Sequence, residues 1–252
     1  MELKEFFDQN PAVAVAFSGG CDSAYLLYSA ARYCEKTCAY YVHSQFQPQF
    51  EMDDAARMCR HLRVDMKVID IDILTDPHIS ENPADRCYYC KHRIFESIIE
   101  AAHADGFEVV VDGTNASDRE DDRPGMVAIR ELGIVSPLRE CGLTKPSIRR
   151  RSSEAGLFTC NKPSYACLAT RIPTGVPITE EHLKRSEHAE TFLTELGFND
   201  FRVRSVFSEG DVPAARIVIE PEQSELLKEN YDTIRNELLK TYSDVITDQE
   251  VR

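Results

Sequence analysis

Two short stretches of the chain combine residue types and spacings that suit chemistry. The first is SGGCDS at 18–23, in which two glycines precede carboxyl and hydroxyl side chains. Glycines let a backbone approach a phosphate closely, and a helix that starts there offers N–H groups and a partial positive charge. The stretch lacks the Gly-Lys-Ser/Thr ending of a Walker A loop, so it is not built for γ-phosphoryl transfer. We expect a phosphate loop in which Asp22 faces a Mg²⁺ ion; the alternative is a Gly-Gly turn without a ligand.

The second stretch is RCYYCK at 86–91, which places Cys87 and Cys90 three positions apart. Such a pair can be a redox couple, half of a zinc site or part of another metal site. A redox pair usually lies at the strand-to-helix junction of a thioredoxin-like unit, whereas this pair follows a polar loop. A zinc site would need a second C-x-x-C, which the remaining cysteines do not form. We therefore expect the pair to belong to a different kind of site.

The composition is that of a globular protein without a membrane segment. Of 252 residues, 42% are hydrophobic, and no apolar run approaches the ~20 residues that cross a bilayer. The charged N-terminal segment lacks the apolar core of a signal peptide, so we expect a cytoplasmic protein. Its nine cysteines are then expected to be thiols or metal ligands rather than disulfides. The net charge of −14 argues against a nucleic-acid partner and favours a small-molecule substrate.

Strand and helix patterns alternate along the first part of the chain. Short apolar runs predict strands, and segments with helical spacing lie between them. The stretch 18–23 falls at the carboxyl end of the first strand, the edge where open α/β sheets bind ligands. We predict an α/β fold, a parallel sheet with helices on both faces. The predicted strands span 13–17, 37–44, 65–73 and 108–115, with a further short strand near 134–138. The predicted helices span 22–34, 50–62, 93–106 and 125–132.

The sequence pattern changes after Pro163. A Pro-rich stretch at 171–179 precedes a helix, two strands of alternating polarity and a second helix from about 221 to 241. We predict a small α+β domain that serves substrate binding or oligomerisation. The predicted domains are 1–169 and 170–252.

The segment FSGGCDS resembles the S-G-G-x-D-S loop of the PP-loop, or N-type, ATP pyrophosphatases. Members of that superfamily cleave ATP between its α and β phosphates and adenylylate a carbonyl or a carboxylate. The resemblance implies that ATP and Mg²⁺ are cofactors, that the loop holds the pyrophosphate, and that residues at other strand ends lie near the nucleotide. The nucleotide-binding residues that it implies are Ser18, Gly19, Gly20, Asp22, Ser23, His43, Gly113 and Asn115.

Four further segments occur in the order NPADRCYYCK, DGTNASDREDDRPG, SPLRECGLTKPSIR and KPSYACLATRIPTG. Together they resemble the LarE-type sulfur transferases of nickel-pincer nucleotide cofactor biosynthesis, over nearly the whole chain. The resemblance implies that ATP adenylylates a carboxylate of pyridinium-3,5-biscarboxylic acid mononucleotide and that pyrophosphate leaves. Sulfur then replaces AMP to give a thiocarboxylate. The family also forms homo-oligomers, which we expect here.

Cys167, in ACLATR, occupies the place of the cysteine that donates sulfur in many members and is left as dehydroalanine. Arg171 follows four residues later, and a nearby cation favours the nucleophilic thiolate. The alternative is a small buried apolar thiol. Some members have a cysteine pair at the position of Cys87 and Cys90 and are thought to use an iron–sulfur cluster. We therefore hypothesise that Cys87, Cys90 and Cys167 hold a [4Fe–4S] cluster whose open iron delivers sulfide, with a sacrificial Cys167 as the alternative.

The mononucleotide substrate carries a phosphate, which needs cations. Arg202 and Arg204 alternate along a predicted strand and so share one face, where two guanidiniums can grip a phosphate. They match the paired arginines of the family; ordinary charged surface is the alternative. Lys91 and Arg171 flank the cysteines and are predicted to offset charge on AMP or substrate. Glu190 is a weaker candidate for a substrate contact, because acidic residues on a polar helix face are usually solvated. The run 149–151 is expected to lie at the surface.

Three other functions stay open at this point. A tRNA-thiolating enzyme would use the same ATP chemistry, although the acidic chain shows no RNA-binding module. An ammonia-dependent amidotransferase of the NAD synthetase type would need no cysteine trio. A non-enzymatic nucleotide or iron–sulfur binding protein would not need an intact S-G-G-x-D-S loop.

Overall fold

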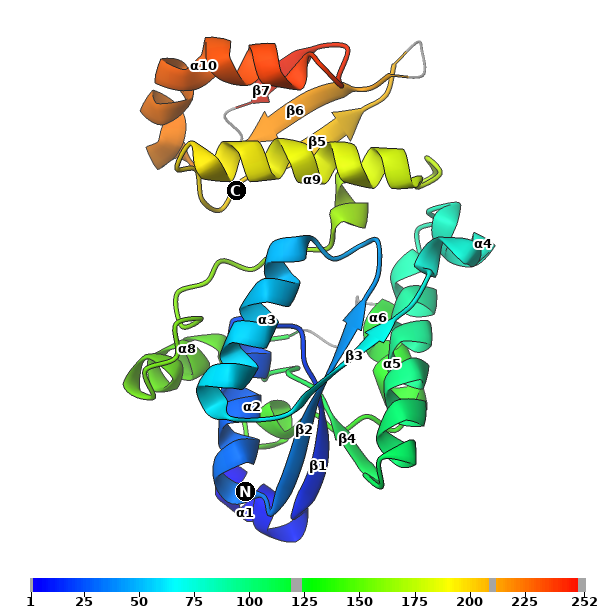
Figure 1. The fold of residues 1–252 in the computed structure, drawn as a ribbon, viewed down its shortest axis with the longest axis vertical. Coiled ribbons are helices and arrows are strands. Elements are labelled where there is room, and N and C mark those ends of the chain that lie inside the picture. The colour runs from blue at the N-terminus through cyan, green and yellow to red at the C-terminus, as the bar shows by residue number, and fades with distance from the viewer. Residues whose placement is uncertain (1, 119–123, 209–211, 249–252) are drawn as a thin grey trace. The chain divides into compact units, whose positions relative to one another are not determined.

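The computed structural model describes residues 2–118, 124–208 and 212–248 (Figure 1). The chain divides into two compact units. The first unit comprises Met1–Ile73 and Asp85–Lys162, and the second comprises Leu74–Ala84 and Pro163–Arg252.

A four-stranded parallel sheet forms the centre of the first unit. The strand order is β3-β2-β1-β4, and Val135 adds a single parallel bridge to Val111 of β4. Apolar, largely β-branched residues suit strands that are buried on both faces. The first four predicted strands are present, whereas the short strand predicted near 134–138 is reduced to the single bridge of Val135. The predicted α/β class is confirmed. The strands are β1 (Ala12–Ala16), β2 (Lys36–His43), β3 (Met66–Asp70) and β4 (Val109–Val111).

Helices cover both faces of this sheet, as predicted (Figure 1). The alternation of side chains along β1 explains why, because Val13 and Val15 pack with α1, α2 and α3 whereas Ala14 packs with α5 and α6. The helices of the first unit are α1 (Leu3–Gln9), α2 (Cys21–Tyr33), α3 (Gln49–Leu62), α5 (Arg86–Ala104), α6 (Pro124–Glu131), α7 (Pro137–Glu140) and α8 (Lys145–Glu154).

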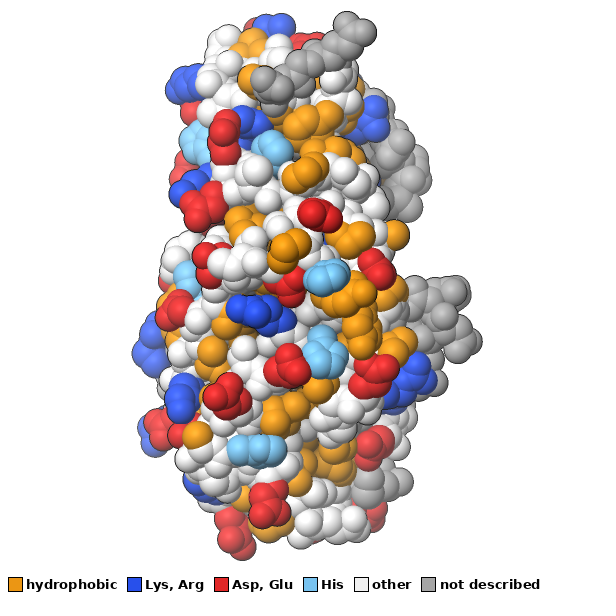
Figure 2. Space-filling view, turned by 90° about the vertical axis from the view of Figure 1, so that its right-hand side faces the viewer, with side chains coloured by type: hydrophobic (Ala, Val, Ile, Leu, Met, Phe, Trp, Pro, Cys, Tyr) orange, Lys and Arg blue, Asp and Glu red, His pale blue; other side chains and the backbone are white. Residues whose placement is uncertain are grey.

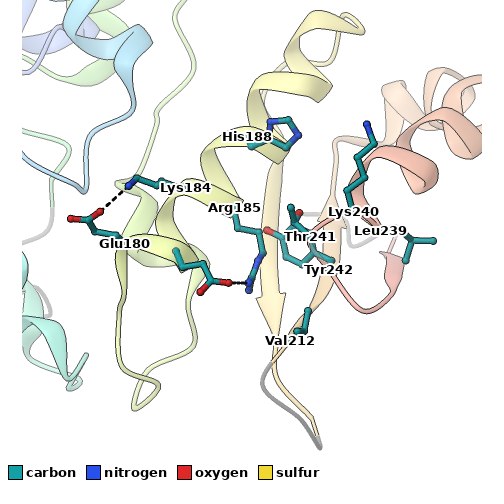
Figure 3. A pocket seen from close by; sticks show the side chains of 10 residues that line it. Glu180, Lys184, Arg185, His188, Val212, Leu239, Lys240, Thr241 and Tyr242 are labelled. Carbon is teal, nitrogen blue, oxygen red and sulfur yellow. Dashed lines mark hydrogen bonds and ion pairs between the residues drawn. The ribbon is translucent and has the colours of Figure 1, made fainter.

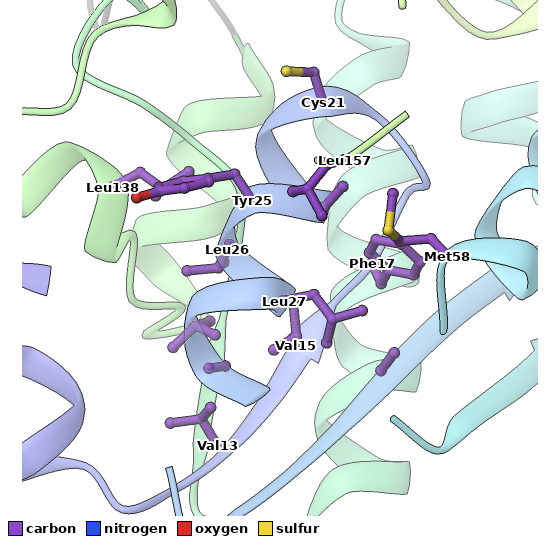
Figure 4. Packing of buried hydrophobic residues seen from close by; sticks show 14 of the residues in the cluster. Val13, Val15, Phe17, Cys21, Tyr25, Leu26, Leu27, Met58, Leu138 and Leu157 are labelled. Carbon is purple, nitrogen blue, oxygen red and sulfur yellow. The ribbon is translucent and has the colours of Figure 1, made fainter. Parts of the chain in front are cut away.

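One apolar core fixes α2 against the sheet. Figure 4 shows Val13 and Val15 of β1 close to Leu27 of α2, with Phe17 and Met58 beside them. The first three of these side chains are fully buried, and each such burial contributes about 1.5–3 kcal/mol. Because β1 and α2 are held on either side of residues 17–20, this core also fixes the path of the phosphate loop.

The second unit contains a three-stranded sheet. Strand β5 pairs antiparallel with β6, and β6 pairs parallel with β7, a strand that the sequence did not predict. Val203, Ala215 and Ile217 are buried against helices α9 and α10. The elements are a short helix α4 (Pro77–Ser80), a 3-10 helix η2 (Leu168–Arg171), α9 (Glu180–Glu195), β5 (Arg202–Val206), β6 (Ala214–Val218), α10 (Ser224–Leu238) and β7 (Val245–Asp248). Two further 3-10 turns are η1 (Ile73–Thr75) and η3 (Pro221–Gln223).

Residues 74–84 belong to the second unit rather than to the sheet that precedes them. Asn82 explains this, because its buried amide donates to the carbonyls of Pro173 at 2.8 Å and Val176 at 3.0 Å. Backbone bonds from Gly175 to Asn82 and from Ile178 to Ser80 complete the connection. The division between units also falls after Lys162, whereas the sequence placed it after residue 169. The segment that carries Cys167 therefore lies in the second unit, and the pair at 87 and 90 lies in the first.

The surface mixes charges of both signs. On the face that Figure 2 shows, acidic and basic side chains are interspersed among apolar ones. Within the described ranges, no helix is both long and apolar enough to cross a membrane.

Asn82→Ala is expected to lower the free energy of unfolding by about 2–4 kcal/mol, because the carbonyls of Pro173 and Val176 lose the buried amide that donates to them and alanine strains a left-handed backbone position. The φ angle of Asn82 is +58°. Urea denaturation measures the change. Asn236→Ala, at an exposed position of α10, is the matched control and is expected to have no measurable effect. Equal stability of the two variants would contradict the prediction.

Candidate active site

The loop between β1 and α2 has the geometry that a phosphate site needs. β1 ends at Ala16, and α2 begins at Cys21 with Gly20 as its N-cap residue. Gly19 has a φ of +73°, and a Cβ there would lie 3.1 Å from the carbonyl oxygen of Glu51, so conformation and space both require glycine. The start of α2 thus lies at the carboxyl edge of the sheet, where helix N–H groups attract an anion.

The end of β4 packs directly on the start of α2. A Cβ on Gly113 would lie 2.9 Å from the backbone nitrogen of Ser23, closer than any side chain tolerates. The Oγ atoms of Ser18 and Ser23 lie 3.0 Å apart, and Ser23 donates to the carbonyl of Gly20 at 3.3 Å. The structure therefore brings Gly113 and the residues of the phosphate loop together at one edge of the sheet.

Asp22 forms an ion pair with Lys145, a residue that the sequence did not indicate as part of the site. The Nζ atom of Lys145, the first residue of α8, donates to Oδ2 of Asp22 at 2.5 Å across 123 positions of sequence. Burial raises the pKa of Asp22, Lys145 opposes that effect, and the carboxylate of Asp118 adds to it. The other oxygen, Oδ1, is buried and has no hydrogen-bond partner among the described residues. A carboxylate oxygen without a donor is a ligand type that Mg²⁺ accepts, so these residues fit a magnesium ion.

The two other predicted strand-end residues have different surroundings. His43, at the end of β2, is half-exposed, and its Nδ1 lies 2.9 Å from Oδ1 of Asp70 at the end of β3. Asn115 shapes the loop after β4, because its Oδ1 accepts from the N–H of Ser117 at 2.8 Å and its own N–H donates to Asp118 at 3.0 Å. Asn115 thereby orients the carboxylate that affects Asp22.

The cysteine pair opens helix α5. Cys87 is exposed and Cys90 is partly buried, and both lie in the first turns of the helix. Tyr88 between them donates to Glu131 of α6 at 2.6 Å. Lys91 lies across Gly125 of α6 so closely that a Cβ on Gly125 would be 2.6 Å from its Cδ. Two contacts with α6 thus fix the start of α5.

A buried ion pair organises the segment around Cys167 in the second unit. Cys167 is partly buried and precedes η2, at whose end Arg171 is only 2% exposed. The guanidinium of Arg171 donates to both oxygens of Glu190, at 2.6 and 3.0 Å. Glu190 also accepts from the hydroxyl of Tyr165 at 2.6 Å and from the N–H of Val203 at 2.9 Å. The expectation of a solvated Glu190 is wrong, because four donors hold this carboxylate inside the unit.

The charge on Arg171 is secured by the same contacts. Burial disfavours the charged form, but hydrogen bonding and charge attraction from Glu190 outweigh it and raise the pKa of Arg171. Its guanidinium carbon also lies 4.8 Å from the centre of the Tyr165 ring. A fixed positive charge therefore lies four residues after Cys167.

The two predicted phosphate-binding arginines differ in environment. Arg202 is buried, and its guanidinium donates to the carbonyls of Ser164 and Phe201, each at 2.5 Å. Arg204 is exposed. The run 149–151 also departs from expectation, because Arg149 is partly buried and donates at 3.0 Å to the carbonyls of residues 160 and 162.

The three proposed cluster ligands are divided between the units. Cys87 and Cys90 belong to the first unit and Cys167 belongs to the second. Within the described parts of the chain, no three His, Cys, Asp or Glu side chains form a group that could hold a metal ion. Thiolates are the ligands that iron–sulfur clusters use, so the donor chemistry of the trio fits, and the cluster remains a hypothesis.

A pocket of about 840 Å³ lies in the second unit, between α9 and the residues that follow α10 (Figure 3). Its lining combines apolar residues with charged ones, among them Lys184, Arg185 and Lys240. Arg185 is bound to Glu181 at 2.5 Å, and Lys184 pairs with Glu180 at 2.8 Å. None of the predicted site residues is among the described residues that line it.

The sheet order, the glycine loop at the carboxyl end of β1 and the acidic residue at the start of α2 define a PP-loop α/β protein. In agreement, a family model described as queuosine biosynthesis protein QueC matches residues 12–83, which span β1 to β3.

Similarity to individual proteins identifies the family within the PP-loop superfamily. The chain is 32% identical over 209 residues to the pyridinium-3,5-bisthiocarboxylic acid mononucleotide synthase of Lactiplantibacillus plantarum, covering 81% of this chain and 76% of the relative. It is 33% identical over 242 residues to an uncharacterised protein of Synechocystis, covering 95% and 87%. It is 31% identical over 242 residues to an uncharacterised protein of Methanocaldococcus jannaschii, covering 96% and 88%. The chain belongs to the family of LarE-type sulfur transferases and is an enzyme of sulfur transfer.

Glu190→Ala is expected to lower the free energy of unfolding by about 3–5 kcal/mol, because it leaves the buried guanidinium of Arg171 without its partner. Urea denaturation of the full chain measures the loss. Glu180→Ala, which removes an exposed ion pair on the same helix, is the matched control and is expected to leave the midpoint unchanged. A Glu190 variant as stable as the control would show that the ion pair of Arg171 and Glu190 does not stabilise the segment around Cys167.

Proposed function

We propose that the protein adenylylates a carboxylate of pyridinium-3,5-biscarboxylic acid mononucleotide with ATP and replaces AMP by sulfur, for nickel-pincer nucleotide cofactor biosynthesis. The observation that carries the proposal is the phosphate loop in which Asp22 and Lys145 meet at the start of α2. The presence of Cys167 and the likeness to the pyridinium-3,5-bisthiocarboxylic acid mononucleotide synthase of Lactiplantibacillus plantarum support the sulfur step. We further propose a cytoplasmic homo-oligomer with no nucleic-acid partner.

The first unit is suited to the activation of the carboxylate. The N–H groups at the start of α2 and the ammonium of Lys145 bind the β and γ phosphates. Asp22 would hold Mg²⁺, which would neutralise phosphate charge when bound. The substrate carboxylate attacks the α phosphorus, and the bond from that phosphorus to the bridging oxygen breaks. Pyrophosphate leaves with the bonding electrons, and an acyl adenylate remains. The loop needs no lysine of its own because Lys145 reaches it from α8.

Cys167 then provides the sulfur. Its thiolate attacks the acyl carbon, AMP leaves, and a thioester forms. Removal of the Cα proton of Cys167 supplies the electrons for a Cα–Cβ double bond as the Cβ–S bond breaks. The products are a thiocarboxylate and a dehydroalanine at position 167. The nearby positive charge of Arg171 favours the thiolate form of the attacking group.

A cluster held by the cysteine pair and Cys167 would be an alternative source of the sulfur. Cys87, Cys90 and Cys167 would hold a [4Fe–4S] cluster by three thiolates, and a sulfide on its open iron would be available to the adenylylated substrate. Cys167 would then be a ligand and would survive turnover. With the pair unused, each protein chain would transfer one sulfur atom only.

Lys145→Met is expected to lower substrate-dependent ATP–pyrophosphate exchange about 10²-fold, because a cation that stabilises charge on the leaving pyrophosphate is lost. Exchange of labelled pyrophosphate into ATP measures the step before sulfur transfer. Lys4→Met, at an exposed position of α1, is the control for the loss of one charge. Exchange that survives in Lys145→Met would remove this lysine from the activation step.

Cys167→Ala is expected to abolish thiocarboxylate formation while pyrophosphate exchange continues, because the acyl adenylate forms before sulfur is needed. Mass spectrometry detects the thiocarboxylate. Cys141→Ala, a partly buried thiol elsewhere in the first unit, is expected to behave as the unaltered protein. Sulfur transfer by Cys167→Ala, or an absence of ATP use by the unaltered protein with this substrate, would refute the proposed function.

The chemical state of Cys167 after turnover distinguishes the two proposed sources of sulfur. Loss of hydrogen sulfide from the peptide that contains it, after one turnover, indicates the sacrificial route. An intact peptide after several turnovers, together with iron and sulfide in anaerobically purified protein, indicates the cluster route. Protein that stays colourless and binds no iron after anaerobic reconstitution excludes the cluster.

A further inference from the structure

The backbone just before Cys167 has no regular secondary structure. Residues 162–167 form neither helix nor strand, and η2 begins directly after them. Ser164 and Ala166 are exposed, whereas Tyr165 between them is partly buried. A segment without helix or sheet hydrogen bonds keeps one conformation only where its side chains fix it. Tyr165, two positions before the cysteine, is therefore the side chain that can anchor this backbone.

The hydroxyl of Tyr165 is bound to the buried ion pair of Arg171 and Glu190. It donates to Oε2 of Glu190 at 2.6 Å, and the same oxygen accepts from Nη2 of Arg171 at 3.0 Å. Glu190 is buried, so water competes little for this carboxylate. Hydrogen bonds to an ionised acceptor are shorter and stronger than those between neutral groups. The hydroxyl therefore connects the segment before Cys167 firmly to helix α9.

The ring of Tyr165 lies close to two buried guanidiniums. Its centre is 4.8 Å from the guanidinium carbon of Arg171 and 5.4 Å from that of Arg202. A cation within about 6 Å of the centre of an aromatic ring is attracted to the face of that ring. Arg202 also donates to the carbonyl of Ser164 at 2.5 Å, so it contacts both the ring and the backbone before it. Groups from η2, α9 and β5 thus converge on one side chain.

Arg171 also contacts the segment after Cys167. The carbonyl of Cys167 accepts from the hydroxyl of Thr170 at 2.8 Å and from the N–H of Thr170 at 3.0 Å. Nη1 of Arg171 in turn donates to that hydroxyl oxygen at 2.6 Å. Removal of the Tyr165 side chain would leave these contacts in place and would release only the backbone before the cysteine.

We propose that Tyr165 is a positioning residue for sulfur transfer, which holds the backbone before Cys167 so that sulfur reaches the acyl adenylate before water does. Water that attacks the acyl carbon releases AMP and regenerates the carboxylate, so ATP is consumed without a product. A displacement of about 1 Å can slow a reaction about 10²-fold, so a loosely held cysteine loses this competition. The role in sulfur transfer rests on the proposed function, whereas the anchoring of the segment does not.

Single-turnover kinetics of the full chain test the role in sulfur transfer. Tyr165→Phe, which removes the hydroxyl and keeps the ring, is expected to lower the rate constant of thiocarboxylate formation about tenfold. Tyr165→Leu, which removes both contacts, is expected to lower it about 10²-fold. The rate constant of pyrophosphate release is expected to stay within about twofold in both variants. A variant that is merely less stable changes the amplitudes of both steps and leaves the ratio of their rate constants unchanged.

Limited proteolysis with subtilisin tests the anchoring without ATP or substrate. Mass spectrometry identifies the cleavage sites, and cleavage within residues 162–167 is expected to be about tenfold faster in Tyr165→Leu, because the local opening that a protease needs becomes easier. Tyr231→Phe, at a partly buried position of α10 in the same unit, is the matched control. It is expected to match the unaltered protein in both measurements. If Tyr165→Leu does not fold, Tyr165→Phe takes its place in the comparison.

The two measurements also separate this role from the proposed function. An unchanged rate constant of thiocarboxylate formation in both variants, or cleavage of the segment at the unaltered rate in Tyr165→Leu, would overturn the proposal. A rate constant of pyrophosphate release that falls as far as that of thiocarboxylate formation would contradict it as well. If the unaltered protein forms no thiocarboxylate from this substrate, the proposed function is wrong, and faster cleavage in Tyr165→Leu still supports the anchoring of the segment.

Discussion

The second unit depends on the carboxylate of Glu190. This side chain accepts hydrogen bonds from Arg171, from the hydroxyl of Tyr165 and from the backbone of Val203. One acceptor therefore joins the segment around Cys167, helix α9 and strand β5. Because a buried charge is stable only while its partners are present, the position of Cys167 relative to the sheet depends on all of these donors together.

The arginines of the second unit differ in burial. Arg171 and Arg202 are directed into the protein, where they bind a carboxylate and backbone carbonyls. Arg204 is exposed and lies opposite Arg216 in the register of β5 and β6. The two buried arginines therefore hold the segment around Cys167 in place.

In the first unit, glycines allow the backbone to approach a phosphate closely. A Cβ at Gly19 or at Gly113 would meet a neighbouring backbone atom, and Gly19 also has a positive φ that favours glycine. The cation that the loop lacks in sequence comes from Lys145, which α8 brings to Asp22. The buried, unpaired oxygen of Asp22 is consistent with a site completed by a metal ion.

The sequence alone determined the α/β class, the strands of the parallel sheet and the phosphate loop, because apolar periodicity and turn residues act over short distances along the chain. It also showed that Arg202 and Arg204 share a strand face. It could not show which of them is buried, that Arg216 faces Arg204, that Lys145 reaches Asp22, or that residues 74–84 join the second unit. Those outcomes depend on contacts between residues far apart in sequence, so only the tertiary structure decided them.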